Sequence, residues 1–273
     1  MRLDYGTLIS FSPLELQCGC SIRSPLLSEI SELTFYIYNS YLALLLMDIR
    51  SYYRGLDNND FEYFTKYTDS ERSLILQIRK EYEALTDEEK ENILPIDVLS
   101  FDPKLISNMA EALSFFIGCD VQYSHSHKSF IHKENGKITC AISRNIYSDI
   151  VDIILQRNGI SRNTPMQEKP KFKSQLAKKL YYRAIEAELK RDKNKGADKN
   201  MEIPNIISSV AARHPSLNII NIWNITIYQL YDQFQRLQNN NLYDIQSMSV
   251  AAWGDEKNKF DAAQWYKNIN HGN

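Results

Sequence analysis

Residues 115–157, FFIGCDVQYSHSHKSFIHKENGKITCAISRNIYSDIVDIILQR, decide the fold of this chain. Asn135 and Gly136 lie between two short apolar segments, and this pair is typical of a two-residue hairpin because both central residues must adopt positive φ. We predict an antiparallel β-meander with strands at 121–124, 129–133 and 137–142. A helix should follow over 145–157 and end at Gly159, and its inward-facing residues should be Tyr147, Ile150, Val151 and Ile154.

The remainder of the chain shows apolar residues at helical spacings of three and four. Helices are expected from Ser24-Pro25 and near Ser70, from the capping box of Thr86 and Glu89, and over 36–53, 102–117, 203–213 and 217–238. Residues 96–101 are expected to form a strand or an extended connection. The fold class is therefore α+β and predominantly α-helical: a helical domain with a small antiparallel β-meander or hairpin, followed by a C-terminal helical region.

Several of these helices have a predicted buried face. The helix over 36–53 should bury Tyr38, Leu42, Leu45 and Ile49. The helix near Ser70 should bury Leu74, Ile78, Tyr82 and Leu85. The helix over 217–238 carries a seam with a period close to 3.5 residues, which is typical of helix packing. The residues of that seam are Ile220, Trp223, Ile227, Leu230, Phe234 and Leu237.

Charge is distributed unevenly although the net charge is only −2. Residues 169–199 hold 11 Lys and Arg against 4 Asp and Glu, whereas residues 1–168 hold 16 against 24. We predict an N-terminal helix-rich domain over 1–168, with its hairpin at 121–142. A basic helix and linker over 169–200 and a C-terminal helical region over 201–273 should follow.

Length and cysteine content indicate an ordinary globular protein. A chain of 273 residues can bury a core without disulfides, and four cysteines are few for a disulfide scaffold. Asp4 interrupts any secretory signal, and the longest apolar run, 41–47, is far shorter than the roughly 20 residues that cross a bilayer. A reducing cytoplasm is therefore the expected compartment, and no membrane partner is expected.

The sequence contains no nucleotide-binding, nucleophile-elbow or zinc-protease motif. Acid pairs such as Glu88-Glu89 and Asp255-Glu256 stand in polar surroundings typical of solvated helix starts, whereas a general acid needs a desolvated pocket. We expect no enzyme activity, no catalytic residue and no cofactor.

One local cluster raises a metal hypothesis, because its side chains are zinc-ligand types. The paired spacings of zinc sites are absent, so the favoured interpretation is two half-buried cysteines and polar hairpin histidines, with no metal. The cluster consists of Cys119, His125, His127, His132 and Cys140.

The basic segment offers an alternative function as a nucleic-acid-associated protein. Its cations could neutralise phosphates while Tyr181 or Tyr182 stacks on bases. The same segment also fits an amphipathic helix with a solvated lysine face, and the whole chain is slightly acidic, so nucleic acid is the less favoured partner. The candidate contacts are Lys171, Lys173, Lys178, Lys179 and Arg183.

Aromatic residues in the C-terminal region are candidates for contact with a protein partner. Most aromatic residues at helical spacing belong to a core, but Trp253 and Trp265 stand in a polar background, as aromatic anchors of interfaces do. The predicted partner-binding residues are Trp223, Trp253, Phe260, Trp265 and Tyr266.

Three stretches together resemble the tail assembly chaperones of long-tailed phages that infect Gram-positive bacteria. They are 18–25 (CGCSIRSP), 115–156 around the Asn135-Gly136 hairpin, and 214–234 (HPSLNIINIWNITIYQLYDQF). The resemblance covers most of the chain and has no catalytic signature.

The resemblance implies a non-enzymatic assembly factor of the host cytoplasm that is absent from the mature virion. Such chaperones hold the helical tape-measure protein soluble and recruit tail-tube proteins around it. The alternative is a phage structural or nucleic-acid-associated protein that uses the basic segment 169–199. Self-association stays open, as does the question of a short or frameshifted form.

Overall fold

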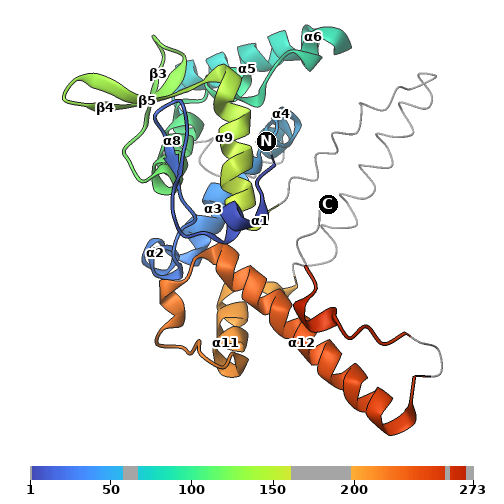
Figure 1. Cartoon of the computed structure of the whole chain (residues 1–273). Coiled ribbons are helices and arrows are strands. Elements are labelled where there is room, and N and C mark those ends of the chain that lie inside the picture. The colour runs from blue at the N-terminus through green and yellow to red at the C-terminus, as the bar shows by residue number, and fades with distance from the viewer. Residues whose placement is uncertain (1, 58–66, 161–197, 256–258, 269–273) are drawn as a thin grey trace, which may run out of the picture. The chain divides into compact units, whose positions relative to one another are not determined.

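The computed structural model describes residues 2–57, 67–160, 198–255 and 259–268. Two compact units are present: unit 1 comprises Met1–Ile160 and Thr226–Tyr228, and unit 2 comprises Ser161–Ile225 and Gln229–Asn273 (Figure 1). The predicted class is confirmed, because helices predominate and two small antiparallel sheets accompany them. The predicted boundary at residue 168 lies outside the described residues and stays a prediction, whereas Thr226–Tyr228 belongs to unit 1.

Unit 1 holds most of the described elements. Its helices are α1 (Tyr5–Ile9), α2 (Leu27–Leu33), α3 (Phe35–Leu46), α4 (Ile49–Asp57), α5 (Asp69–Ala84), α6 (Asp87–Glu91), α7 (Pro95–Leu99), α8 (Pro103–Ile117) and α9 (Arg144–Arg157). Its strands are β1 (Leu14–Glu15), β2 (Ser21–Ile22), β3 (Gln122–Ser124), β4 (Ser129–Glu134) and β5 (Lys137–Ser143). The predicted capping box at Thr86 and Glu89 opens α6.

The predicted meander is confirmed, with strand order β3-β4-β5. Asn135 and Gly136 have φ values of 51° and 77°, as the hairpin chemistry requires. Phe130 on β4 lies opposite Ile142 on β5, and both side chains are buried. The meander therefore has one face in the core of unit 1.

Helices α8 and α9 flank the meander in sequence and begin and end as predicted. The Asp102 carboxylate accepts hydrogen bonds from the backbone N–H groups of Lys104 and Leu105, and Gly118 closes α8 in the left-handed conformation. Helix α8 contacts α3, β2 and β3, and α9 contacts β5. All four predicted inward-facing residues of α9 are buried: Tyr147, Ile150, Val151 and Ile154.

Three local predictions for unit 1 are wrong. The expected helix over 36–53 is interrupted after α3 because Asp48 starts a new helix, accepting a hydrogen bond from Ser51 N at 2.6 Å. Residues 96–101 are largely helical, since Pro95 occupies the first turn of α7, where its fixed φ suits a helix. On α5, the predicted inward residue Leu74 is exposed and its neighbour Ile75 is buried, whereas the predicted Ile78, Tyr82 and Leu85 are half-buried.

Cysteine pairing is a further correction. Cys20 and Cys140 form a disulfide across a sequence separation of 120 residues, so Cys140 is not the half-buried free thiol that the sequence suggested. Cys18 and Cys119 are free and partly exposed. The pairing joins the residue just before β2 to β5, which the sequence pattern placed in unrelated segments.

Buried polar groups tie the N-terminal segment of unit 1 to the end of α9. The buried Arg157 guanidinium donates to the carbonyl oxygens of Thr7, Ser10 and Ser12 at 3.4, 3.0 and 2.8 Å, and to Ser24 Oγ at 3.2 Å. Burial lowers the pKa of this guanidinium. Because carbonyl groups replace water around the cation, it can lie in the core.

Unit 2 holds α11 (Ile203–Arg213), the short 3-10 helices η2 (Lys199–Met201), η3 (Ile222–Asn224) and η4 (Gln264–Tyr266), and most of α12 (Ile227–Trp253). The prediction for α11 is confirmed. The predicted helix over 217–238 is wrong at both ends, because α12 begins at Ile227 and ends at Trp253. The side chains of Asn218 and Asn221 bond to backbone N–H groups nearby, and such bonds compete with helix formation. Ile220 of the predicted seam is consequently 83% exposed.

No helix among the described residues combines the length and the apolar character that a membrane span requires.

Candidate partner-binding surface

Helix α12 has different surroundings along its length. Leu230, near its start, is fully buried, whereas four large apolar side chains in its second half are exposed. At 3.6 residues per turn these four side chains lie within about 140° of the helix circumference. We call them the α12 face: Leu242, Ile245, Met248 and Trp253.

The C-terminal tail covers another side of the same helix. The rings of Tyr243 and Phe260 lie 5.6 Å apart, and Arg236 donates to the Lys267 carbonyl oxygen at 3.0 Å. Tyr243 and Arg236 point nearly opposite to the middle of the α12 face on a helical projection. The tail therefore leaves the α12 face in solvent.

Local hydrogen bonds fix the tail where it returns along α12. The Asp255 carboxylate accepts from the N–H groups of Lys259 and Phe260 at 3.0 and 2.8 Å, just after Gly254 with φ 77°. The Asp261 carboxylate accepts from Ala263 N and pairs with Lys267 Nζ at 3.3 Å. These contacts lower the pKa of Asp261, the Ala263 N–H contributing most.

The five predicted partner-binding residues fall into two groups. Trp253 is 84% exposed, and Trp265 and Tyr266 are also exposed, with their rings edge to face at 5.0 Å. Phe260 is half-buried against Tyr243, and Trp223 is half-buried with its Nε1 donating to the Ile219 carbonyl oxygen at 2.8 Å. The first group has free ring surface for a partner, and the second has an intramolecular role.

Sequence reasoning missed Leu242, Ile245 and Met248 as candidates, because it ended the helix at Gln238. The signal was present, since these residues recur at spacings of three beyond that point. Correct placement of the helix end at Trp253 would have revealed a continuous apolar face.

The five basic residues proposed for nucleic-acid contact, Lys171, Lys173, Lys178, Lys179 and Arg183, lie outside the described residues. Their prediction stays a prediction, and the described part of the chain adds no argument for it.

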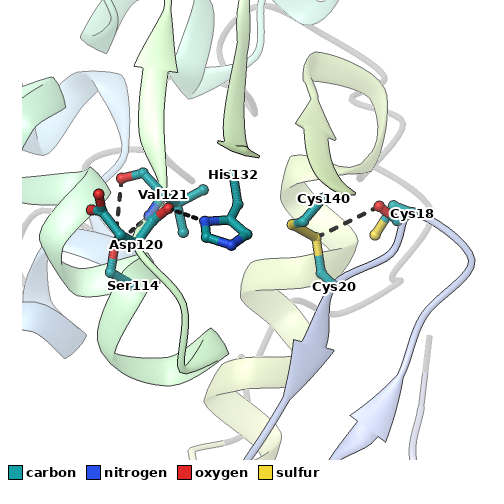
Figure 2. The surroundings of a disulfide bond; sticks show 7 residues. All are labelled: Cys18, Cys20, Ser114, Asp120, Val121, His132 and Cys140. Carbon is teal, nitrogen blue, oxygen red and sulfur yellow. Dashed lines mark hydrogen bonds between the residues drawn. A yellow bond between two sulfur atoms is a disulfide. The ribbon is translucent and has the colours of Figure 1, made fainter. Parts of the chain in front are cut away.

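The residues of the metal hypothesis have other contacts. His132 Nδ1 lies 2.6 Å from the Asp120 carbonyl oxygen, and Cys140 is in the disulfide (Figure 2). His127 Nδ1 lies 2.9 Å from Ser124 Oγ, and the His125 ring is edge to face with Tyr123. Burial, followed by Asp120 and Glu134, raises the pKa of the Cys119 thiol. Within the described ranges, no group of three or more His, Cys, Asp or Glu side chains could hold a metal ion.

A protein-family model matches the part of the chain that carries this surface. Residues 192–270 match the family described as the YomV second domain. YomV is a phage-derived protein name, so the match supports a phage association. No curated protein and no solved structure matches the chain.

The matched range contains α11, α12 and the described tail, and hence the whole α12 face. The chain is thus a predominantly helical α+β protein whose C-terminal part is similar to a phage-associated domain.

Proposed function

We propose that this protein is a phage tail assembly chaperone, a non-enzymatic factor that binds the tape-measure protein and recruits tail-tube proteins around it. It acts in the host cytoplasm and leaves before the virion is complete. The observation that carries the proposal is the exposed α12 face within the segment that matches a phage-associated family.

The shape of the α12 face supports a helical partner. Leu242 and Trp253 are eleven residues apart, which corresponds to about 17 Å at 1.5 Å per residue. A linear apolar stripe of three turns fits the apolar stripe of a second helix better than it fits a small ligand, which needs a concave pocket. A tape-measure helix exposes such a stripe before the tube encloses it.

The exposed rings of the C-terminal tail are a second argument for a protein partner. Trp265 and Tyr266 lie on η4, which Asp261 holds in place, so both rings are presented at low entropic cost. Aromatic anchors of this kind contribute a large share of binding energy at protein interfaces. A few such anchors give moderate affinity, and moderate affinity allows tube proteins to displace the chaperone.

Co-expression with the tape-measure protein tests the proposal directly. The chaperone should keep the tape-measure protein in the soluble fraction. Ile245→Asp combined with Met248→Asp should abolish that rescue, because two carboxylates in the α12 face would have to be desolvated on binding. The outcome that contradicts the proposal is unchanged solubility of the tape-measure protein with and without the chaperone.

The matched control is Asn240→Asp, which adds a carboxylate at an exposed position of the same helix on the side away from the α12 face. It should rescue like the unmodified protein. Trp253→Ala and Trp265→Ala test the aromatic contacts separately, and retained rescue would remove these two residues from the binding surface. Circular dichroism of each variant establishes that helix content is unchanged.

A further inference from the structure

The segment from Leu16 to Leu26, which we call the strap, connects distant parts of unit 1. Arg23 N donates to the Phe116 carbonyl oxygen at 3.1 Å, and Ser24 Oγ donates to the Arg157 carbonyl oxygen at 2.8 Å. Ile227 N donates to the Pro25 carbonyl oxygen at 3.1 Å. The C-terminal half of the strap is therefore held by three separate elements.

The N-terminal half of the strap meets β5 at the disulfide (Figure 2). Ala141 N donates to the Cys18 carbonyl oxygen at 3.2 Å, and a Cβ on Gly19 would lie 2.0 Å from the Thr139 carbonyl oxygen. Gly19 also has φ of 78°, so a side chain is excluded on two grounds. The turn that carries Cys20 is shaped to approach β5 closely.

Hydrogen bonding between this half of the strap and β5 is sparse, although Cys20 itself is fully buried. In the described part of the chain one backbone hydrogen bond joins the strap to β5, and β1 and β2 have only two residues each. A two-stranded hairpin is marginally stable alone. The disulfide adds a covalent tie between hairpin and sheet.

We propose that the Cys20–Cys140 disulfide is a redox-dependent latch. When the bond is closed, the hairpin covers the Thr139–Ala141 edge of β5. When the bond is reduced, the hairpin leaves that edge, while Ser24 and Pro25 keep the rest of the strap in place. The latch stands on the geometry of unit 1 and does not depend on the proposed chaperone function.

Closure proceeds by thiol–disulfide exchange with a small disulfide such as oxidised glutathione. The Cys20 thiolate attacks one sulfur of glutathione disulfide and releases one glutathione thiolate. The Cys140 thiolate then attacks the Cys20 sulfur of the mixed disulfide and releases the second. Each cysteine loses one proton and the pair loses two electrons to glutathione. The raised pKa of Cys119 keeps that thiol protonated and disfavours it as a competing nucleophile.

The latch has a consequence for the expected compartment. Disulfides in a reducing cytoplasm are mostly transient or redox-sensing, whereas they persist after exposure to oxidising surroundings. The latch is therefore open while the protein stays in a reducing cell, and it closes when the protein meets an oxidising medium.

Amide hydrogen exchange of the full chain tests the latch, in a Cys18→Ser, Cys119→Ser background that leaves only the pair. After treatment with oxidised glutathione, alkylation under denaturing conditions should find no free thiol. Reduction with dithiothreitol should then accelerate exchange at Leu16 N and Ala141 N by about tenfold or more, with no change at Ile154 N in α9. Unchanged exchange at the first two sites, or two free thiols after oxidation, would overturn the proposal.

The variant Cys20→Ser, Cys140→Ser is the second measurement. Its exchange at Leu16 N and Ala141 N should match that of the reduced protein and should not respond to dithiothreitol. A response to dithiothreitol in this variant would assign the effect to the reagent and would also overturn the latch. If the variant does not fold, reduction of the native-cysteine protein with a phosphine in place of dithiothreitol separates the effect of the bond from that of the reagent.

Discussion

Unit 1 and the second half of α12 differ in how they treat apolar and polar groups. In unit 1, α9 buries Ile150, Val151 and Ile154, and even its arginine at 157 has its guanidinium bonded inside the core. In α12, Ile245 is 63% exposed although it stands on a well-formed helix. Among the described residues, unit 1 therefore buries its apolar and polar groups together in one core, while the α12 face leaves large apolar side chains in solvent.

The largest expected effect comes from removing the buried cation of unit 1. Arg157→Ala leaves the carbonyl oxygens of Ser10 and Ser12 without their donor and opens a cavity, so the free energy of unfolding should fall by about 3–5 kcal/mol. Urea denaturation measures this loss. Arg144→Ala is the matched control, because its ion pair with Asp97 is solvent-exposed and its removal should cost far less. Equal losses for the two variants would show that Arg157 is not part of a completed core.

A smaller effect separates two adjacent tyrosines of α4. Tyr52 donates to the buried Asp102 carboxylate at 2.9 Å, so Tyr52→Phe should lower the free energy of unfolding by about 1–3 kcal/mol. Within the described part of the chain the Tyr53 hydroxyl is buried without a hydrogen-bond partner, so Tyr53→Phe should be nearly neutral or slightly stabilising. A larger loss for Tyr53→Phe than for Tyr52→Phe would contradict this assignment.

Removing one methylene from each region tests whether the side chain there is buried. Ile154→Val in α9 should cost about 0.5–1.5 kcal/mol, because it removes a methylene from the core. Ile245→Val in α12 should change the free energy of unfolding by less than about 0.5 kcal/mol, since the side chain lies in solvent. Thermal or urea unfolding measures both. A cost at Ile245 similar to that at Ile154 would mean that the α12 face is covered within the chain.

A further effect is confined to alkaline pH. Burial raises the pKa of Tyr53 from 10.0 to about 12, with Tyr82 and Glu83 adding and Arg79 opposing. Between these pH values the unfolded chain binds fewer protons at this site than the folded chain, so Tyr53 lowers stability as pH rises. Tyr53→Phe should therefore flatten the fall in stability from about pH 10 to about pH 12. Urea titrations of both proteins check the slope, and identical slopes would refute the assignment.

Elements with local signals could be predicted from the sequence alone. The Asn135-Gly136 turn, the caps at Asp102 and Gly118 and the buried face of α9 depend on residues within one or two turns of each other. Local signals also predicted the predominantly helical α+β class. Errors arose where a nearby side chain overrode the helical pattern, as Asp48 does after α3 and as Asn218 and Asn221 do before α12.

Contacts between residues far apart in the sequence became known only from the tertiary structure. Cys20 pairs with Cys140, and Arg157 reaches Thr7, Ser10 and Ser12, although no spacing in the sequence indicates these contacts. The exposure of the α12 face likewise depends on where the tail packs, because an apolar stripe on a helix has the same pattern whether it is covered or open. Periodicity specifies a face, and the chain's path through space specifies what covers it.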